Sequence, residues 1–433
     1  MKLIANPSRD SWSDILKRPT LDKLDLDAIV QDVFDAVKSK GDKAVIEYTK
    51  KFDKASLPNI SVSESEISEG VALVSDELKE AIQLAKKNIE TFHASQKIEK
   101  QLVETAPGVQ CWQESRGIEK VGIYIPGGSA PLFSTVLMLA VPAKLGGCKE
   151  IVLCSPPNKE GKLHPAILYA AQLCGVTNIF KVGGIQAIGA MTFGTESVPN
   201  VFKIFGPGNQ YVTAAKQVAL SEGVSIDMPA GPSELLVLAD ETANAAFVAS
   251  DLLSQAEHGG DSQVICVSNS ESFLQEVSEE VTKQLAILPR KEIAEKAIEN
   301  SKSILLKDKQ DIIDLINEYG PEHFILAVEN EDFYLENIVN AGSVFIGNYT
   351  PESAGDYASG TNHTLPTDGF SKSFSGVNLD AFVKKITFQR ISKKGIQNIG
   401  NAIELMAEAE GLQAHKNAVT LRLNELKEDE DGI

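Results

Sequence analysis

The chain has 433 residues, enough for two or three domains, and its 43% hydrophobic and 23% charged residues are ordinary for a globular protein. Its formal net charge of −19 argues against a nucleic-acid or anionic-membrane partner, because either would favour a basic face. The first residues resemble no signal peptide and no run of 18 apolar residues occurs, so we expect a cytoplasmic protein without a membrane span.

The first hundred residues are predicted to be helical. Residues 26–37 place apolar side chains at helical spacing, and a second amphipathic helix is predicted over about 71–92. His93 follows this helix, where we expect a surface or capping residue without a functional role. His164 precedes a proline at a predicted helix start, and we expect it to cap that helix.

From about residue 119 the pattern of a β-strand, a glycine turn and a helix occurs four times. The predicted strands are 121–125, 151–154, 178–182 and 201–205. This alternation is typical of βαβ units on a parallel sheet, which bind ligands at the carboxyl ends of the strands. No turn reads GxGxxG, so the standard dinucleotide-binding motif is absent. A phosphate could still bind at a helix N-terminus, or the glycines could serve only as tight turns.

A second set of alternating elements follows. The predicted strands are 233–238, 263–267, 303–306, 324–328 and 343–346. From about Leu379 we predict helix to the end, with a frayed acidic tail. The fold class is therefore α/β, with two Rossmann-like but incomplete parallel-sheet domains and helical extensions at both ends. The predicted divisions are an N-terminal region 1–118, α/β domains 119–232 and 233–376, and a C-terminal tail 377–433.

Several polar side chains are candidates for a metal site. Gln255 and His258 are three residues apart and share a face at the end of a predicted helix, where His258 could alternatively only cap the last carbonyls. Asp356 and His415 lie in polar, glycine-bearing stretches and would complete a nitrogen and oxygen donor set suited to zinc. The spacing of these residues is not diagnostic.

An adjacent acid and imidazole, Glu322 and His323, could activate water or act as a general base near such a metal. No GxSxG or HExxH motif is present, which disfavours a serine hydrolase or a zincin protease.

The cysteines are odd in number and form no CxxC pair, so we predict reduced structural thiols. They are Cys111, Cys148, Cys154, Cys174 and Cys266. A cysteine thiohemiacetal, as in aldehyde dehydrogenases, is an alternative route for oxidising an aldehyde, although no cysteine falls in the polar clusters.

Eight segments, in order along the chain, resemble the histidinol dehydrogenase family. They are VGIYIPGGSAPLFSTVLMLAVPA at 121–143, GGIQAIGAMTFGT at 183–195, KIFGPGNQYVTAAK at 203–216, IDMPAGPSE at 226–234, DLLSQAEHG at 251–259, GPEHFIL at 320–326, SAGDYASGTNHTLPT at 353–367 and AEGLQAH at 409–415. The resemblance implies oxidation of L-histidinol to L-histidine through histidinal with two NAD⁺, the last step of histidine biosynthesis. The missing GxGxxG is also what this family shows.

The resemblance also implies roles for individual residues. His323 matches the base that takes the alcohol proton, and Glu322 matches the acid that activates water on the aldehyde. The implied ligands of one zinc per subunit, which also holds the substrate, are Gln255, His258, Asp356 and His415. Further implied substrate contacts are Ser233, His363 and Glu410, and implied NAD contacts are Tyr124, Gln186 and Asn209.

Members of the family are homodimers, so the resemblance implies that Glu410 and His415 reach the active site of the other subunit. We also expect the N-terminal region to contribute to the second α/β domain and to the dimer.

Three alternative functions remain open. The chain could be a relative that oxidises another polar alcohol, a zinc hydrolase that uses Glu322 and His323 on water, or a metal-binding protein without catalytic activity.

Overall fold

The computed structural model describes residues 1–19, 26–127, 131–229 and 231–431. The turn predicted at 126–131 therefore lies partly outside the described residues. The chain divides into two compact units: unit 1 comprises Met1–Gln96 and Ile118–Phe382, and unit 2 comprises Lys97–Gly117 and Val383–Ile433. Among the described residues, no helix has both the length and the apolar character needed to cross a membrane.

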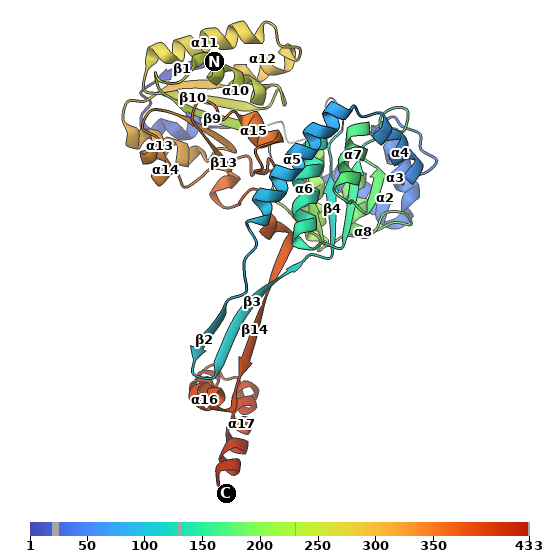
Figure 1. Cartoon of the computed structure of the whole chain (residues 1–433), viewed down its shortest axis with the longest axis vertical. Coiled ribbons are helices and arrows are strands. Elements are labelled where there is room, and N and C mark those ends of the chain that lie inside the picture. The colour runs from blue at the N-terminus through green and yellow to red at the C-terminus, as the bar shows by residue number, and fades with distance from the viewer. Residues whose placement is uncertain (20–25, 128–130, 230, 432–433) are drawn as a thin grey trace. The chain divides into compact units, whose positions relative to one another are not determined.

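The first α/β domain of unit 1, which contains the strand labelled β4 in Figure 1, has a five-stranded parallel sheet in the order β6-β5-β4-β7-β8. Its strands are β4 (Lys120–Tyr124), β5 (Glu150–Ser155), β6 (Asn178–Lys181), β7 (Lys203–Phe205) and β8 (Ser225–Ile226). The helices between them are α6 (Phe133–Gly146), α7 (Pro165–Leu173), α8 (Gly184–Phe193) and α9 (Gln210–Ser221). The four predicted strands and the parallel sheet are confirmed, and the short β8 is an addition.

The N-terminal helices pack on this first domain. They are α2 (Leu26–Lys40), α3 (Asp42–Phe52), α4 (Glu64–Ala72) and α5 (Asp76–Ala94). Helix α2 packs on α8 and α9, α4 on α7, and α5 on α6. The single helix predicted over 71–92 is wrong at its start, because Ser75 caps α5 by accepting a hydrogen bond from the backbone N–H of Leu78.

The second α/β domain has a six-stranded parallel sheet in the order β1-β11-β10-β9-β12-β13. Its strands are β1 (Lys2–Ala5), β9 (Glu234–Ala239), β10 (Gln263–Ser268), β11 (Lys302–Leu305), β12 (His323–Ala327) and β13 (Ser343–Ile346). Its helical segments are η1 (Arg9–Ser11), α1 (Trp12–Ile15), α10 (Ala245–Ala256), α11 (Glu271–Leu285), α12 (Lys291–Glu299), α13 (Lys309–Tyr319), α14 (Asp332–Asn337), α15 (Glu352–Tyr357) and η2 (Phe370–Lys372). The short η3 (Leu379–Phe382) instead packs on α6 of the first α/β domain. The N-terminal region thus supplies this sheet with strand β1, although we predicted only helix there.

Both sheets are buried on their two faces, as parallel sheets covered by helices require. In β9 the side chains alternate between two cores: Leu235 and Val237 face one, and Leu236 and Leu238 face the other. The chain therefore reads as a continuous apolar run there, and polar residues fall at the strand ends.

Unit 2 is a three-stranded antiparallel sheet followed by two helices. The strands lie in the order β14-β3-β2 and are β2 (Leu102–Ala106), β3 (Val109–Gly117) and β14 (Val383–Ile391). The helices α16 (Lys393–Ala409) and α17 (Gln413–Asp431) pack against each other. The prediction of helix from about Leu379 onward is wrong for β14, and α17 continues through the acidic stretch that we expected to fray. The partner of β14 lies about 270 residues earlier in the chain, where local periodicity cannot detect it.

Candidate active site

Helix α10 ends at the first pair of predicted ligands. Asn244 caps its start by accepting hydrogen bonds from the backbone N–H groups of Ala246 and Phe247. Gln255, in the last turn, is only 1% exposed, and neither atom of its side-chain amide has a hydrogen-bonding partner among the described residues. His258 lies just beyond the helix and borders a pocket. A buried amide without partners is costly, which points to a ligand for it.

A second helix brings acidic side chains to His258. Glu352 and Asp356 are four residues apart, on one face of α15. One donor atom from each of His258, Glu352 and Asp356 lies within 4.8 Å of the other two, in a cluster able to hold a metal ion. Glu352 is buried, and both its carboxylate oxygens lack a partner in the described part of the chain. Sequence reasoning missed Glu352, although its spacing of four from Asp356 was a usable signal.

The acid and imidazole pair lies at the start of β12, and the backbone of Glu234 on the neighbouring strand β9 contacts both. The Glu234 N–H donates to Oε2 of Glu322 at 3.0 Å, and Nδ1 of His323 lies 3.4 Å from the Glu234 carbonyl oxygen. A carbonyl can only accept, so Nδ1 carries a proton, and in the neutral form of the ring the lone pair is on Nε2. Nε2 is buried and 3.7 Å from Oδ1 of Asp356.

The surroundings of this pair shift its pKa values. Burial raises the pKa of Glu322 to about 7, against the lowering effect of His323 and of the Glu234 N–H. Burial alone would lower the pKa of His323, but the carboxylates of Glu352, Glu322 and Asp356 outweigh it and raise that pKa to about 10. The neutral ring therefore becomes available as a base only if positive charge offsets these carboxylates.

His363 connects the two α/β domains within unit 1. Its Nδ1 donates to the carbonyl oxygen of Asp356 at 2.9 Å, so its Nε2 accepts from the Thr135 hydroxyl at 3.0 Å. Burial lowers the pKa of His363, which favours the neutral ring. His363 thus fixes the backbone at Asp356.

A pocket of about 1100 Å³ borders this cluster. Its lining includes the predicted substrate contact Ser233, the predicted metal ligand His258 and the predicted NAD contact Asn209. The pocket therefore joins residues of the two α/β domains, as a site for a substrate and a dinucleotide needs.

The predicted NAD contacts lie at the carboxyl ends of strands in the first sheet. Tyr124 ends β4, and its hydroxyl oxygen accepts from the Gly184 N–H at 3.1 Å. Gln186 is fully buried and donates to Oδ2 of Asp53 at 3.2 Å. Asn209 is exposed and caps α9. Asn209 borders the pocket, whereas the Tyr124 hydroxyl contacts the start of α8 and Gln186 joins α8 to Asp53 at the end of α3.

Glu410 and His415 belong to unit 2. Glu410 is the C-terminal cap of α16, and His415 lies in the first turn of α17 with an exposed side chain. Their part in the site stays a prediction.

The other histidines and the cysteines lie outside this cluster. His164 caps α7 by accepting from the Ala166 N–H, as predicted. His93 is not a surface residue: it is fully buried, and its Nδ1 contacts the carbonyl oxygen of Ile89 at 2.8 Å. All five cysteines are free thiols, as predicted. Burial raises the pKa of four of them, which makes them poor nucleophiles: Cys148, Cys154, Cys174 and Cys266.

Comparison with known proteins agrees with this site. The family model described as histidinol dehydrogenase matches residues 16–423. A histidinol dehydrogenase of Bacteroides thetaiotaomicron is 62% identical over 427 residues, 99% of this chain and 100% of that protein. One of Escherichia coli K12 is 53% identical over 417 residues, covering 96% and 95%. The crystal structure of histidinol dehydrogenase from Elizabethkingia anophelis is 60% identical, with a TM-score of 0.97 and 99% coverage of both chains.

The fold and the site define an α/β enzyme with a buried acid and imidazole beside a cluster of metal-ligand type. The chain belongs to the histidinol dehydrogenase family, which confirms the resemblance found in its sequence. It is therefore an oxidoreductase of histidine biosynthesis.

Proposed function

We propose that the protein is a zinc-containing, NAD-dependent L-histidinol dehydrogenase that converts L-histidinol to L-histidine through L-histidinal. The observation that carries this proposal is the buried pair of Glu322 and His323 beside the cluster of His258, Glu352 and Asp356, where Nε2 of His323 lies 3.7 Å from Oδ1 of Asp356. A four-electron oxidation of an alcohol needs a base for the alcohol proton and a group that activates water on the aldehyde. The pair supplies one side chain for each task.

The residues present suit both bound groups. The donor set of Gln255, His258 and Asp356, completed by His415 of the partner subunit, has the nitrogen and oxygen chemistry that zinc accepts. Zinc, when bound, would supply an anchor for the non-reacting end of the substrate and a positive charge that offsets the neighbouring carboxylates. NAD⁺, when bound at the pocket beside Asn209, would supply the acceptor for hydride.

His323 is the proposed base of the first oxidation. The Glu234 carbonyl holds its Nδ1 proton, which leaves the Nε2 lone pair for the alcohol proton. The carboxylates that raise the pKa of His323 to about 10 act less strongly once their charge is offset. A positive charge beside them lowers the pKa of the ring and so favours its neutral form, which is the form that accepts the alcohol proton.

Glu322 is the proposed water activator of the second oxidation. Its carboxylate takes one proton from water while the water oxygen bonds to the aldehyde carbon of histidinal, which gives the anion of the hydrate, the form from which the second hydride is lost. A pKa of about 7 suits this step, because the carboxylate is then partly ionised and basic enough to accept the proton. The N–H of Glu234 holds Oε2 in place during the transfer.

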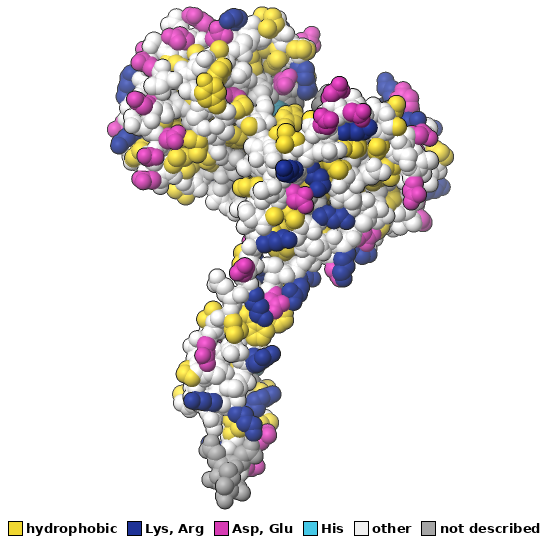
Figure 2. Space-filling view, in the orientation of Figure 1, with side chains coloured by type: hydrophobic (Ala, Val, Ile, Leu, Met, Phe, Trp, Pro, Cys, Tyr) yellow, Lys and Arg dark blue, Asp and Glu magenta, His cyan; other side chains and the backbone are white. Residues whose placement is uncertain are grey.

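We infer a homodimer with shared active sites. Unit 2 exposes large apolar side chains, as surfaces that pair with another chain do (Figure 2). They include Leu102, Val103, Leu405, Met406, Leu412 and Leu421.

The sharing of active sites between subunits is tested by mixing subunits that carry Asp356→Asn with subunits that carry His415→Asn. Each variant alone should be inactive, and mixed dimers should regain activity at one of their two sites. A mixture as inactive as its parents would refute the shared site.

The reaction is tested by measuring NADH absorbance during exhaustive turnover of a limiting amount of L-histidinol, with and without prior chelation. We expect two NADH for each histidinol, loss of activity on chelation and its return with added zinc. One NADH with released aldehyde would contradict the role of Glu322. No NADH at all would leave another polar alcohol or a hydrolytic reaction as the function.

A further inference from the structure

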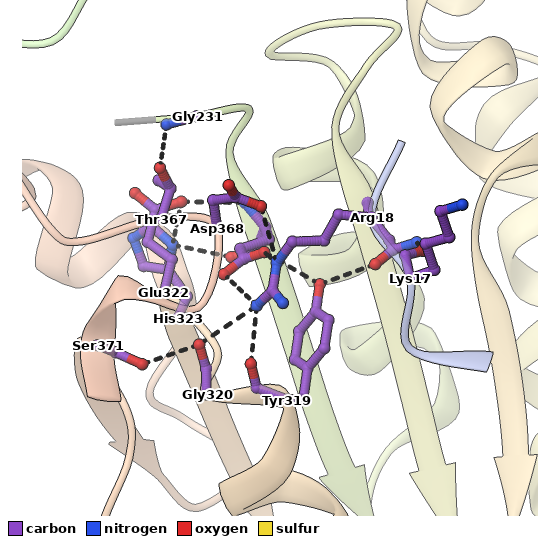
Figure 3. A network of polar contacts seen from close by, with 12 residues as sticks. Lys17, Arg18, Gly231, Tyr319, Gly320, Glu322, His323, Thr367, Asp368 and Ser371 are labelled. Carbon is purple, nitrogen blue, oxygen red and sulfur yellow. Dashed lines mark hydrogen bonds and ion pairs between the residues drawn. The ribbon is translucent and has the colours of Figure 1, made fainter. Parts of the chain in front are cut away.

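Arg18 lies at the end of the described N-terminal segment and joins two parts of the second α/β domain (Figure 3). Its Nε and Nη2 both donate to the carboxylate of Glu234, the latter at 2.9 Å. The same Nη2 donates to the carbonyl oxygen of Tyr319 at 2.8 Å and contacts that of Gly320 at 3.4 Å. The guanidinium also lies 4.1 Å from the centre of the Tyr319 ring. Arg18 is therefore attached on two sides at once.

One attachment fixes the residue that holds the catalytic pair. The Glu234 side chain is only 2% exposed, and its Oε2 also accepts from the Tyr319 hydroxyl at 3.2 Å. The backbone N–H of this same residue binds Glu322, and its carbonyl contacts His323. A shift of Glu234 would therefore change the orientation of both catalytic side chains together.

The other attachment fixes the turn from which the catalytic pair emerges. Gly320 ends α13 with a φ of +60°, and it precedes Glu322 by two residues. A side chain at Gly320 would approach the Ser371 hydroxyl, which itself donates to the Gly320 carbonyl at 2.8 Å. The carbonyls at the end of a helix lack partners within the helix, and here Arg18 supplies one.

We propose that Arg18 is a positioning residue that orients Glu322 and His323 by holding Glu234 and the Tyr319–Gly320 turn in one arrangement. This inference rests on the proposed function, because it assigns Arg18 a part in the chemistry of that pair. Nothing in the roles inferred from the sequence includes Arg18 or Glu234. The simpler interpretation is that Arg18 only attaches the N-terminal segment to the domain.

Arg9 provides a matched control for that simpler interpretation. It lies in the same segment and also pairs with α13, through Asp311 and Asp314 at 2.6 Å each. Its side chain is 56% exposed and stacks on Trp12, far along the segment from Arg18. Arg9→Gln therefore loosens the segment without removing a contact to Glu234 or Gly320.

The main variant is Arg18→Gln combined with Glu234→Gln. It removes both charges together, so no unpaired carboxylate is left in the interior to unfold the protein. Arg18→Lys is the second variant, because lysine keeps the charge but cannot present the planar fork that contacts Glu234 and two carbonyls.

The first readout is amide hydrogen exchange, which needs no enzymatic activity. In the double variant, exchange at the Glu234 amide and in residues 319–323 should rise about tenfold or more, while Arg9→Gln leaves it unchanged. Unchanged exchange in the double variant would overturn the proposal. If the wild-type enzyme reduced no NAD⁺ with L-histidinol, the proposed function would fail, and this readout would still decide whether Arg18 holds the pair.

The second readout is steady-state turnover of L-histidinol. The double variant should lose about tenfold to a hundredfold in kcat with KM changed by less than about threefold, since misplaced catalytic groups affect the chemical step. Arg18→Lys should show a similar loss, and Arg9→Gln should show none. In a Glu322→Gln background the added loss should be smaller, because the part that acts through Glu322 is already gone and only the part that acts through His323 remains. Equal losses in both backgrounds would refute a role through Glu322.

Discussion

Replacing Gln255 with leucine should change stability in opposite directions with and without zinc. Gln255 is 1% exposed, and both atoms of its amide lack partners in the described chain. In the metal-free protein this amide is a buried polar group without compensation, which costs ~1–3 kcal/mol. Leucine has a similar size and no polar atoms, so chelated Gln255→Leu should be more stable than chelated wild type by ~1–2 kcal/mol.

Zinc should reverse that order if Gln255 is a ligand. At a free zinc concentration of about 100 times the dissociation constant, wild type gains ~2.7 kcal/mol from binding. A variant whose affinity falls ~100-fold, as loss of a ligand group allows, gains only ~0.4 kcal/mol at the same zinc concentration. The zinc-loaded variant should therefore be less stable than zinc-loaded wild type by ~0.3–1.3 kcal/mol.

The assay is urea unfolding at one protein concentration, with chelator or with a fixed free zinc concentration. Gln263→Leu is the matched control. Gln263 is 2% exposed like Gln255, but its amide contacts the Tyr319 hydroxyl and the carbonyl oxygens of Lys17 and Asn300. This control should lose ~1–3 kcal/mol in both conditions and keep the full gain from zinc.

Two outcomes would refute the reasoning about Gln255. If chelated Gln255→Leu were less stable than chelated wild type, its amide would have a favourable partner in the metal-free protein. If zinc stabilised the variant as much as wild type, Gln255 would not be a ligand, and Glu352 would be the next candidate in the cluster.

Three further outcomes are expected. Glu322→Gln should lower kcat by a factor of about 10²–10⁴. It should also move the yield from two NADH per histidinol toward one, because histidinal accumulates. An unchanged yield would exclude Glu322 as the water activator. Asp53→Asn should stabilise the protein by ~1 kcal/mol at pH 8 but not at pH 4. Burial raises the pKa of this half-buried carboxyl to about 6, so its ionisation opposes folding only as the pH rises above about 4. A gain in stability of equal size at both pH values would contradict this cause. Replacing any single cysteine with serine should leave turnover within a few fold of the wild-type value. A loss of several orders of magnitude at one position would favour a thiohemiacetal mechanism. The positions are Cys111, Cys148, Cys154, Cys174 and Cys266.

Local sequence was sufficient for most of the α/β architecture. Strands buried on both faces read as short apolar runs, and glycine-containing turns separate them from helices, so the alternation along 119–346 predicts two parallel sheets. The chemical types at the site could also be recognised, because Glu322 and His323 are an adjacent acid and imidazole before an apolar run, and Asp356 lies in a polar, glycine-bearing stretch. Their specific roles came from the resemblance to a family and not from their spacing.

Pairings between distant parts of the chain were not visible in the sequence. Strand β14 pairs with β3 and strand β1 pairs with β11, across about 270 and 300 residues, and neither reads as a strand without its partner. His93 precedes polar residues at a helix end, yet the fold buries it. In each case tertiary contacts outweigh the local preference.

By itself the sequence determined the fold class and the order of nine strands of the two parallel sheets, because these depend on local periodicity, and it supplied the candidate acid, base and ligand side chains through their chemistry. Only the tertiary structure decided that Glu352 joins His258 and Asp356, and that Arg18 reaches Glu234 and the turn before Glu322. Those contacts link residues about 100 to 300 positions apart, and packing of whole elements sets their distances. No local pattern contains that information.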